Sequence, residues 1–218
     1  MTGQIGGRQR AVAGRSPEPA EPPADNHHAG QVTPKEAMEL VQHIEPNNFT
    51  LADLDALPDD GSQYELVDGI YLVTPSPTLL HQVAVAELSY LLRQKCPAGY
   101  RVIQAPMDYR PTAGRSLQPD VIVATRDDPG PDALRLPLLL AVEVLSPATR
   151  SKDLVLKRNL YEEAGVAAYW MFDPEAEILT VLELEDGRYA ERAVVKAEEA
   201  FEAELPFAVR VVPAELVG

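Results

Sequence analysis

Two apolar segments of the chain each carry a single acidic residue. In residues 119–124 a proline and Asp120 precede an apolar run rich in β-branched side chains, and in residues 138–147 Glu143 lies near the end of a longer apolar run. Both patterns predict buried strands. A carboxylate within a buried strand is costly unless it is paired, hydrogen-bonded or bound to a metal ion. Two such strands constrain the fold, and if they are neighbours their acids need a shared explanation.

Two explanations fit the residue types around these acids. A Mg²⁺ ion takes hard oxygen ligands, usually one or two carboxylates together with water and substrate phosphate. Alternatively, each acid forms a structural ion pair with a nearby arginine, for which Arg110, Arg115 and Arg150 are the candidates. The residue types alone leave both explanations open.

The length and composition of the chain agree with one globular domain and a tail. The 218 residues, 45% of them hydrophobic, are enough to bury a sizeable core. The sequence has no run of eighteen apolar residues and no positively charged apolar leader, so we expect no membrane span, no secretory signal and a cytoplasmic location. The single cysteine, Cys96, cannot form an internal disulfide, and we expect a buried or half-buried thiol.

The charge of the chain is strongly acidic but unevenly distributed. The formal net charge is −15, which disfavours tight nonspecific binding to nucleic acid because such binding relies on Lys and Arg. Residues 93–158, however, contain eleven basic and seven acidic side chains. The region around the two acidic strands is therefore the basic part of the chain.

The order of predicted elements indicates an α/β fold with a mixed sheet. Residues 1–32 are rich in proline and glycine and predict a disordered tail, which leaves residues 33–218 as a single domain. Helices are predicted at 33–44, in a short segment from Thr50, at 76–94 and from residue 151. Strands are predicted at 64–74 as a hairpin, at 100–109, at 119–124, at 138–147, at 167–173, at 178–184 and 188–195 as a hairpin, and at 207–212. Residues 111–118 and 126–136 are expected as loops, the second being the expected contact for a substrate or partner.

Several short motifs occur in a characteristic order through most of the predicted domain. They are 64–69 (YELVDG), His81, 119–120 (PD), 142–147 (VEVLSP), Lys157 with Tyr161, 164–166 (AGV), 169–170 (YW) and 173–174 (DP). No single motif is specific, but together they resemble the Uma-type restriction endonuclease family of the PD-(D/E)XK nuclease superfamily. This resemblance implies a restriction-endonuclease-like mixed β-sheet flanked by helices. It also implies a magnesium-dependent or manganese-dependent endonuclease that acts on nucleic acid, DNA in the first place, and a homodimer as one assembly.

One position departs from the superfamily pattern. That pattern has a lysine two residues after the second acid, where this chain has Leu145. The family is similar to others in which the lysine has moved to the following helix, and Lys157 is then the candidate. Lys157 lies one helical turn after Asp153 and one turn before Tyr161, so the three share a face and the other two could position the lysine.

The resemblance adds two further candidates. Glu65 would be an extra acid near the metal ion, although an alternating strand also allows it to face solvent. His81 lies in the first turn of a predicted helix, where a role in packing or hydrogen bonding is the alternative to a role as catalytic group or ligand.

The resemblance leads to a specific expectation for the chemistry. Asp120 and Glu143, with a backbone carbonyl near Val144, would hold one Mg²⁺ ion that acidifies a water molecule and neutralises charge on the scissile phosphate. Lys157 would orient the water or stabilise the transition state. The alternative is a catalytically silent nuclease-like module for binding or assembly, which Leu145 and the acidic surface favour. The active nuclease and the silent module differ in whether Lys157 reaches the carboxylates.

Overall fold

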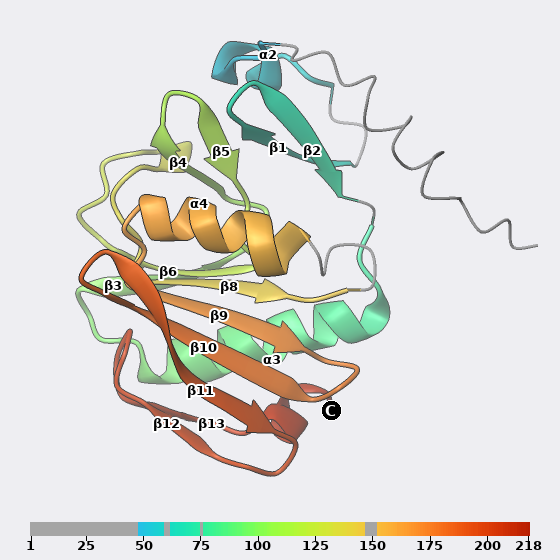
Figure 1. Ribbon diagram of the computed structural model, residues 1–218, viewed down its shortest axis with the longest axis vertical. Helices are drawn as coiled ribbons and strands as arrows, with labels where there is room; N and C mark the ends of the chain where they lie inside the picture. The colour runs from blue at the N-terminus through green and yellow to red at the C-terminus, as the bar shows by residue number, and fades with distance from the viewer. Residues whose placement is uncertain (1–47, 59–61, 75, 147–151) are drawn as a thin grey trace, which may run out of the picture. The chain divides into compact units, whose positions relative to one another are not determined.

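The structure is a computed structural model that describes residues 48–58, 62–74, 76–146 and 152–218. The predicted tail at 1–32 and the predicted helix at 33–44 lie outside these residues, as does Arg150. Two sheets and two longer helical segments make up most of the described part (Figure 1). The mixed α/β architecture expected from the sequence is confirmed.

The larger sheet has six strands in the order β11-β10-β9-β8-β6-β3. Their bounds are β3 Tyr100–Gln104, β6 Val121–Thr125, β8 Leu140–Val144, β9 Ala168–Asp173, β10 Ile178–Glu185 and β11 Arg188–Lys196. β8 and β9 run parallel, and every other neighbouring pair in this sheet is antiparallel. The two acid-bearing segments predicted as buried strands are thus β6 and β8, which pair directly with each other.

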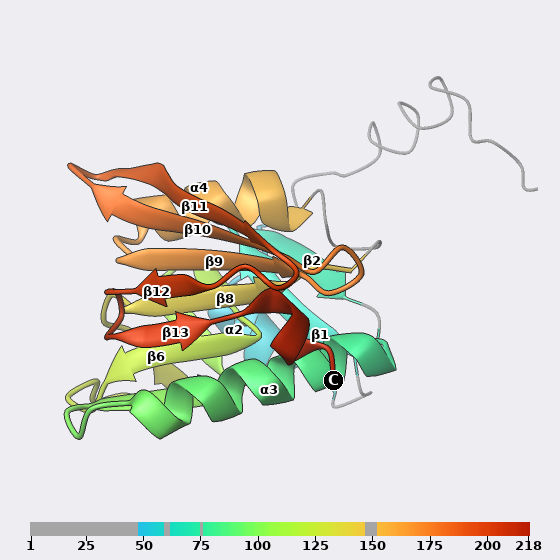
Figure 2. The same ribbon diagram turned by 90° about the horizontal axis from the view of Figure 1, so that it is seen from below.

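Side-chain alternation along β8 divides the larger sheet into two faces. Leu140, Val142 and Val144 pack in the core cluster that also contains side chains of α3 (Leu79–Lys95). Ala141 and Leu145 pack in a second cluster together with residues of α4 (Arg158–Glu163). Figure 2 shows α3 and α4 on opposite sides of the strands. Because successive side chains of a strand point to opposite faces, the intervening Glu143 lies on the α4 side.

The helix that carries Lys157 begins as a π-helix. This segment, η1, spans Lys152–Lys157, and α4 continues directly from it. The helix ends where the sequence predicts, at Ala164 as C-cap and Gly165 with φ of +71°. Single π-helical turns are rare and are found frequently at functional sites. The sequence predicts a helix here, but not its π form.

The smaller sheet has five strands in the order β2-β1-β5-β4-β7. Their bounds are β1 Gln63–Val67, β2 Ile70–Thr74, β4 Asp108–Thr112, β5 Arg115–Leu117 and β7 Ala133–Leu134. The hairpin β1-β2 turns at Asp68 and Gly69, whose φ angles of 48° and 90° are those that a tight two-residue turn requires. This hairpin is confirmed as predicted.

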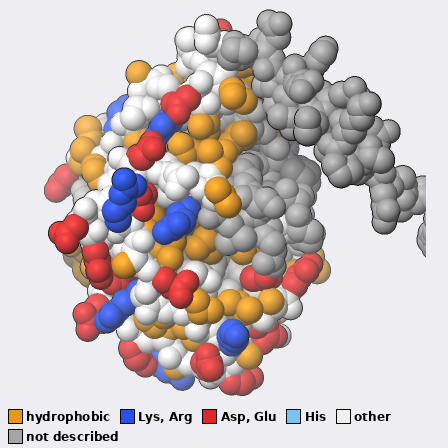
Figure 3. All heavy atoms as spheres, viewed as in Figure 1, with side chains coloured by type: hydrophobic (Ala, Val, Ile, Leu, Met, Phe, Trp, Pro, Cys, Tyr) orange, Lys and Arg blue, Asp and Glu red, His pale blue; other side chains and the backbone are white. Residues whose placement is uncertain are grey.

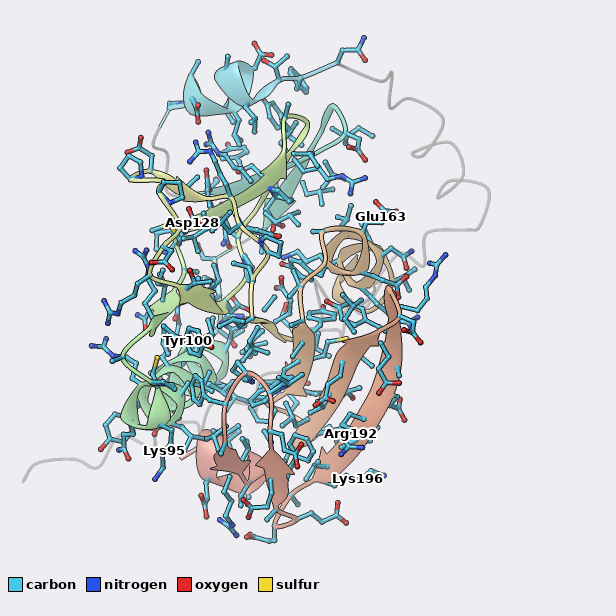
Figure 4. The ribbon with its side chains drawn as sticks, turned by 90° about the vertical axis from the view of Figure 1, so that its left-hand side faces the viewer. Lys95, Tyr100, Asp128, Glu163, Arg192 and Lys196 are labelled. Atoms are coloured by element: carbon cyan, nitrogen blue, oxygen red, sulfur yellow. The ribbon has the colours of Figure 1, made fainter. Side chains whose placement is uncertain are left out.

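Two predictions for the middle of the chain are wrong, and a third holds only in part. Residues 100–109 are not one strand, because the chain leaves the larger sheet after β3, passes the Ala105-Pro106 bond and enters the smaller sheet as β4. Residues 111–118 are not a loop, since they include β5. The segment 126–136 includes β7, and within it the buried Asp128 (Figure 4) accepts hydrogen bonds from three backbone N–H groups. Most of the segment is exposed and irregular, as predicted for a loop, but Asp128 and β7 anchor it to the rest of the fold.

The remaining predicted elements differ from the structure only in detail, whereas two short elements near the end of the described chain were not predicted. The short helix α2 (Leu51–Asp55) has the capping box at Thr50 and Asp53, and α3 begins at Leu79 with Thr78 as N-cap, two residues later than expected. The predicted last strand is β13 (Val209–Val211), which pairs with β12 (Phe201–Ala203) in a separate two-stranded sheet before the short helix η2 (Pro213–Leu216). Cys96 is a free, half-buried thiol, as expected. No helix of residues 48–58, 62–74, 76–146 or 152–218 has both the length and the apolar character needed to cross a membrane.

Candidate active site

A buried lysine lies between two buried carboxylates on the α4 side of the larger sheet. Lys157 Nζ is 2.8 Å from Glu143 Oε1 of β8 and 3.0 Å from Glu65 Oε1 of β1. The three residues are only 4%, 3% and 1% exposed, respectively. A helix and one strand from each of the two sheets therefore meet at this ammonium group.

Tyr161 also binds Glu143. Its hydroxyl donates to the same Oε1 atom at 2.6 Å, and its ring lies 5.1 Å from the ring of Tyr169. Burial, with the negative charges of Glu143 and Glu65, holds the pKa of Tyr161 well above its usual range. The phenol is therefore a neutral donor. Because Lys157 and Tyr161 are four residues apart on one helix, both donors reach the same carboxylate oxygen.

Glu65 does not face solvent, so the alternative considered for it from the sequence is wrong. Besides the ammonium group, its Oε1 accepts the backbone N–H of Gln118 at 2.8 Å. Val67, two residues along β1, packs against the same cluster of buried residues as Tyr161. Because Glu65 and Val67 point to the same face of β1, Glu65 also points inward, towards α4.

Asp120 lies at the entrance to β6, beside the strand that carries Glu143. Its Oδ2 accepts the backbone N–H of Val144 at 2.7 Å and lies 3.3 Å from His81 Nε2. Val121 pairs with Val142 in the antiparallel register of β6 and β8. Continued by one residue, this register places Asp120 opposite Glu143. The first turn of α3 brings His81 to the same end of the sheet.

The described arginines do not form the ion pairs that were the alternative to a metal site. Asp120 and Glu143 contact neither Arg110 nor Arg115 within the described residues, and the third candidate, Arg150, lies outside them. The partners are Asp55 and Asp108 for Arg110, and Asp68 and Glu163 (Figure 4) for Arg115. The arginine explanation is thus excluded for the two arginines that the structure describes.

The charges and donor atoms at this site suit a hard divalent cation. Among the described residues, the carboxylates of Glu65 and Glu143 lie at Lys157, and that of Asp120 lies at His81. In the part of the chain that the structure describes, no group of three or more His, Cys, Asp or Glu residues is arranged to hold an ion. Mg²⁺, however, typically takes one or two carboxylates and completes its shell with water and phosphate. The donor chemistry therefore fits Mg²⁺ or Mn²⁺.

The structure thus brings together the residues that the sequence singled out, in two connected groups. Lys157, Glu143, Glu65 and Tyr161 form one group, and Asp120 with His81 forms the other, adjacent to it. The side chain of Asp153 lies outside the described residues. Sequence reasoning missed the two backbone donors, at residues 118 and 144, because every residue except proline carries an N–H group and none is marked by its side chain.

Comparisons with known proteins agree with this architecture. A family model described as "Uma2: Putative restriction endonuclease" matches residues 51–214. Among solved structures, the chain is similar to a protein described as a putative nuclease belonging to DUF820 from Anabaena variabilis, with a TM-score of 0.63 and 16% sequence identity over 78% of this chain and 97% of that chain. At this level of identity the likeness shows a shared fold. No match was found among curated proteins.

Proposed function

Because the chain belongs to the Uma2 family, described as "Putative restriction endonuclease", we propose that it is a nuclease that hydrolyses phosphodiester bonds with Mg²⁺ or Mn²⁺. The observation that carries the proposal is the position of Lys157. The position that holds the lysine in the superfamily pattern is Leu145 here, and the ammonium group of Lys157 lies 2.8 Å from Glu143 instead. In this proposal, the helical segment after β8 supplies the positively charged side chain that the Leu145 position lacks.

The carboxylates and the lysine have complementary roles in this proposal. Asp120 and Glu143 would hold the divalent ion, with Glu65 as an additional acid beside it. When bound, such an ion lowers the pKa of a water molecule and neutralises charge on the scissile phosphate. Lys157 supplies a fixed positive charge that stabilises the negative charge developing on the phosphate.

The neighbouring side chains keep these groups in place. The hydroxyl of Tyr161 and the ammonium of Lys157 both bind Glu143 Oε1, so this carboxylate has one defined orientation. The N–H of Val144 fixes Asp120 from the adjacent strand, and His81 contacts the same Asp120 oxygen. Groups that are already held in position need little reorganisation during the reaction, so little free energy is spent on moving them.

The proposed substrate is nucleic acid, with DNA as the first candidate. On the face shown in Figure 3, Asp and Glu side chains are interspersed with Lys and Arg side chains. With a net charge of −15, nonspecific binding to the phosphate backbone would be weak and would fall further with salt. Assays at low ionic strength are therefore the appropriate starting point.

A cleavage time course tests the proposal. Plasmid, single-stranded DNA and RNA are incubated with wild type and Lys157→Met in Mg²⁺, in Mn²⁺ or in a chelator. We expect metal-dependent cleavage by wild type and a loss of roughly 10²-fold or more in Lys157→Met, the scale seen when one electrostatic stabiliser is removed. The matched control is Lys196→Met, which removes a lysine charge from an exposed position on β11 (Figure 4) and should leave the rate unchanged.

Calorimetry separates metal binding from turnover. Wild type should bind Mn²⁺, and Asp120→Ala should abolish the binding heat because it removes one of the proposed carboxylate ligands. Metal binding without cleavage of any substrate would favour the silent binding module. Equal rates for wild type and Lys157→Met would refute the role of the lysine.

A further inference from the structure

We propose that Gln118 is a positioning residue for this site, which holds Glu65 against Lys157 through its backbone N–H while its side chain is anchored to Asp108. The inference rests on the proposed function for its effect on metal binding. Its structural part concerns hydrogen bonds within this chain and can be tested without metal.

Gln118 connects the smaller sheet to the buried lysine through short hydrogen bonds. Its side-chain Nε2 donates to Asp108 Oδ1 at 2.7 Å, and its backbone N–H donates to Glu65 Oε1 at 2.8 Å. The same Glu65 oxygen lies 3.0 Å from Lys157 Nζ. A displacement of Gln118 would therefore be transmitted to the ammonium group through one carboxylate oxygen.

Asp108, which binds the Gln118 side chain, is itself held by hydrogen bonds. Asp108 Oδ2 accepts from Arg110 Nη2 at 2.6 Å and from Arg110 Nε at 3.1 Å, and Arg110 Nε also lies within hydrogen-bonding distance of Ser116 Oγ, at 3.2 Å. Asp108 opens β4, and the pairing of Tyr109 with Leu117 continues by one residue to place Asp108 opposite Gln118. Charge-assisted bonds of this kind are stronger than neutral ones. Asp108 is thus a fixed acceptor for the Gln118 amide.

The orientation of the Gln118 amide is also determined. With the amide reversed, its carbonyl oxygen would face the Asp108 carboxylate, two acceptors with no proton between them. The observed Oε1 is buried and has no hydrogen-bond partner among the described residues. The contact with Asp108 is therefore the hydrogen bond that ties this side chain down.

The segment that begins at Gln118 also carries Asp120, another acid of the site. Pro119 follows, with a fixed φ and no N–H to donate, and Asp120 comes next. Because only one rigid residue separates them, the tie between Gln118 and Asp108 constrains both the N–H that binds Glu65 and the backbone that carries Asp120. Outer residues that orient metal-binding carboxylates typically change metal affinity by 10–100-fold when they are altered.

The first test measures hydrogen exchange in the metal-free full-length protein. Gln118→Met keeps the side-chain size and the backbone N–H but removes the amide that binds Asp108. We expect the N–H of residue 118 to exchange about tenfold faster than in wild type, because its bond to Glu65 opens more often. Asp108→Ala, which leaves Gln118 intact and removes its anchor, should give the same change and replaces Gln118→Met if that variant does not fold. Asp68→Asn, which weakens an exposed Arg115 contact on the same sheet, should leave this N–H unchanged.

The second test is a double-mutant cycle on Mn²⁺ affinity. Gln118→Met should weaken Mn²⁺ binding by about tenfold. The loss should be clearly smaller in a Glu65→Gln background, because the part of the effect that passes through the Glu65 carboxylate is then absent and only the part that acts on the Asp120 backbone is left. Equal losses in both backgrounds would mean a general structural effect and would overturn the proposal. Unchanged exchange of the residue 118 N–H in both Gln118→Met and Asp108→Ala would overturn it as well. If wild type binds no Mn²⁺, the metal proposal itself fails, and the exchange data still decide whether Gln118 positions Glu65.

Discussion

Replacing Lys157 by methionine should strongly destabilise the metal-free protein. Methionine has a similar length and fills the space of the lysine stem, so the change removes charge more than volume. It leaves Glu65 and Glu143, 1% and 3% exposed, facing each other without the ammonium group that lies 3.0 and 2.8 Å from them. Two buried negative charges are then left close together without the lysine charge that offsets them.

The structure sets the size of this effect. Removing one partner from a buried ion pair costs about 3–5 kcal/mol, because the remaining charge is left uncompensated. For a domain of about 150–250 residues, each kcal/mol lowers Tm by roughly 2–4 °C. The expected loss in Tm is therefore about 10 °C. Much of it should be recovered by adding Glu65→Gln, since the double variant buries one carboxylate and not two.

Urea unfolding in the presence of a chelator measures this loss. The single tryptophan, Trp170, is fully buried in β9 and reports unfolding by its fluorescence. Lys196→Met, which removes an exposed lysine, should stay within about 0.5 kcal/mol of wild type. A loss below about 1 kcal/mol in Lys157→Met, or no recovery on adding Glu65→Gln, would refute the view that Lys157 compensates two buried charges.

Two further predictions concern the scaffold. Burial raises the pKa of Tyr109 to about 12 and raises those of Tyr161 and Tyr189 as well. The unfolded chain therefore releases phenol protons above about pH 10 that the folded chain keeps, and stability should fall there by about 1.4 kcal/mol per pH unit for each tyrosine. Urea unfolding between roughly pH 9 and 11 checks this, with a shallower slope expected in Tyr109→Phe and an unchanged slope counting against the argument. In the second, Gly130→Ala should cost about 2–4 kcal/mol in the same assay, because its Cβ would lie 1.8 Å from a backbone carbonyl oxygen, whereas Gly99→Ala, with no atom within 4 Å, should cost little.

Much of the candidate site could be predicted from local sequence patterns. Single acids in the apolar runs around Asp120 and Glu143 indicated buried strands with charges that need partners, because a buried carboxylate is costly in any fold unless it gains a partner. The spacing of Lys157 and Tyr161 placed both on one helix face, since helix periodicity is local. The structure has both side chains at Glu143, as this spacing requires.

Strand pairing could not be predicted in the same way. Residues 100–109 were predicted as one strand, yet they enter two different sheets on either side of Pro106. The short strands β5 and β7 were read as loops because each has only two or three residues and is defined by its partners. Strand propensity mainly reflects packing against neighbours, and those neighbours come from distant parts of the chain.

The sequence by itself determined which residues carry charge within apolar segments, and the local periodicity that brings Lys157 and Tyr161 to one face. Only the tertiary structure decided that Glu65 is buried, because an alternating strand allows either face to meet the core. It also decided that the backbone N–H groups of Gln118 and Val144 bind Glu65 and Asp120. Such donors are the same at nearly every residue, so their role depends on what the fold places opposite them.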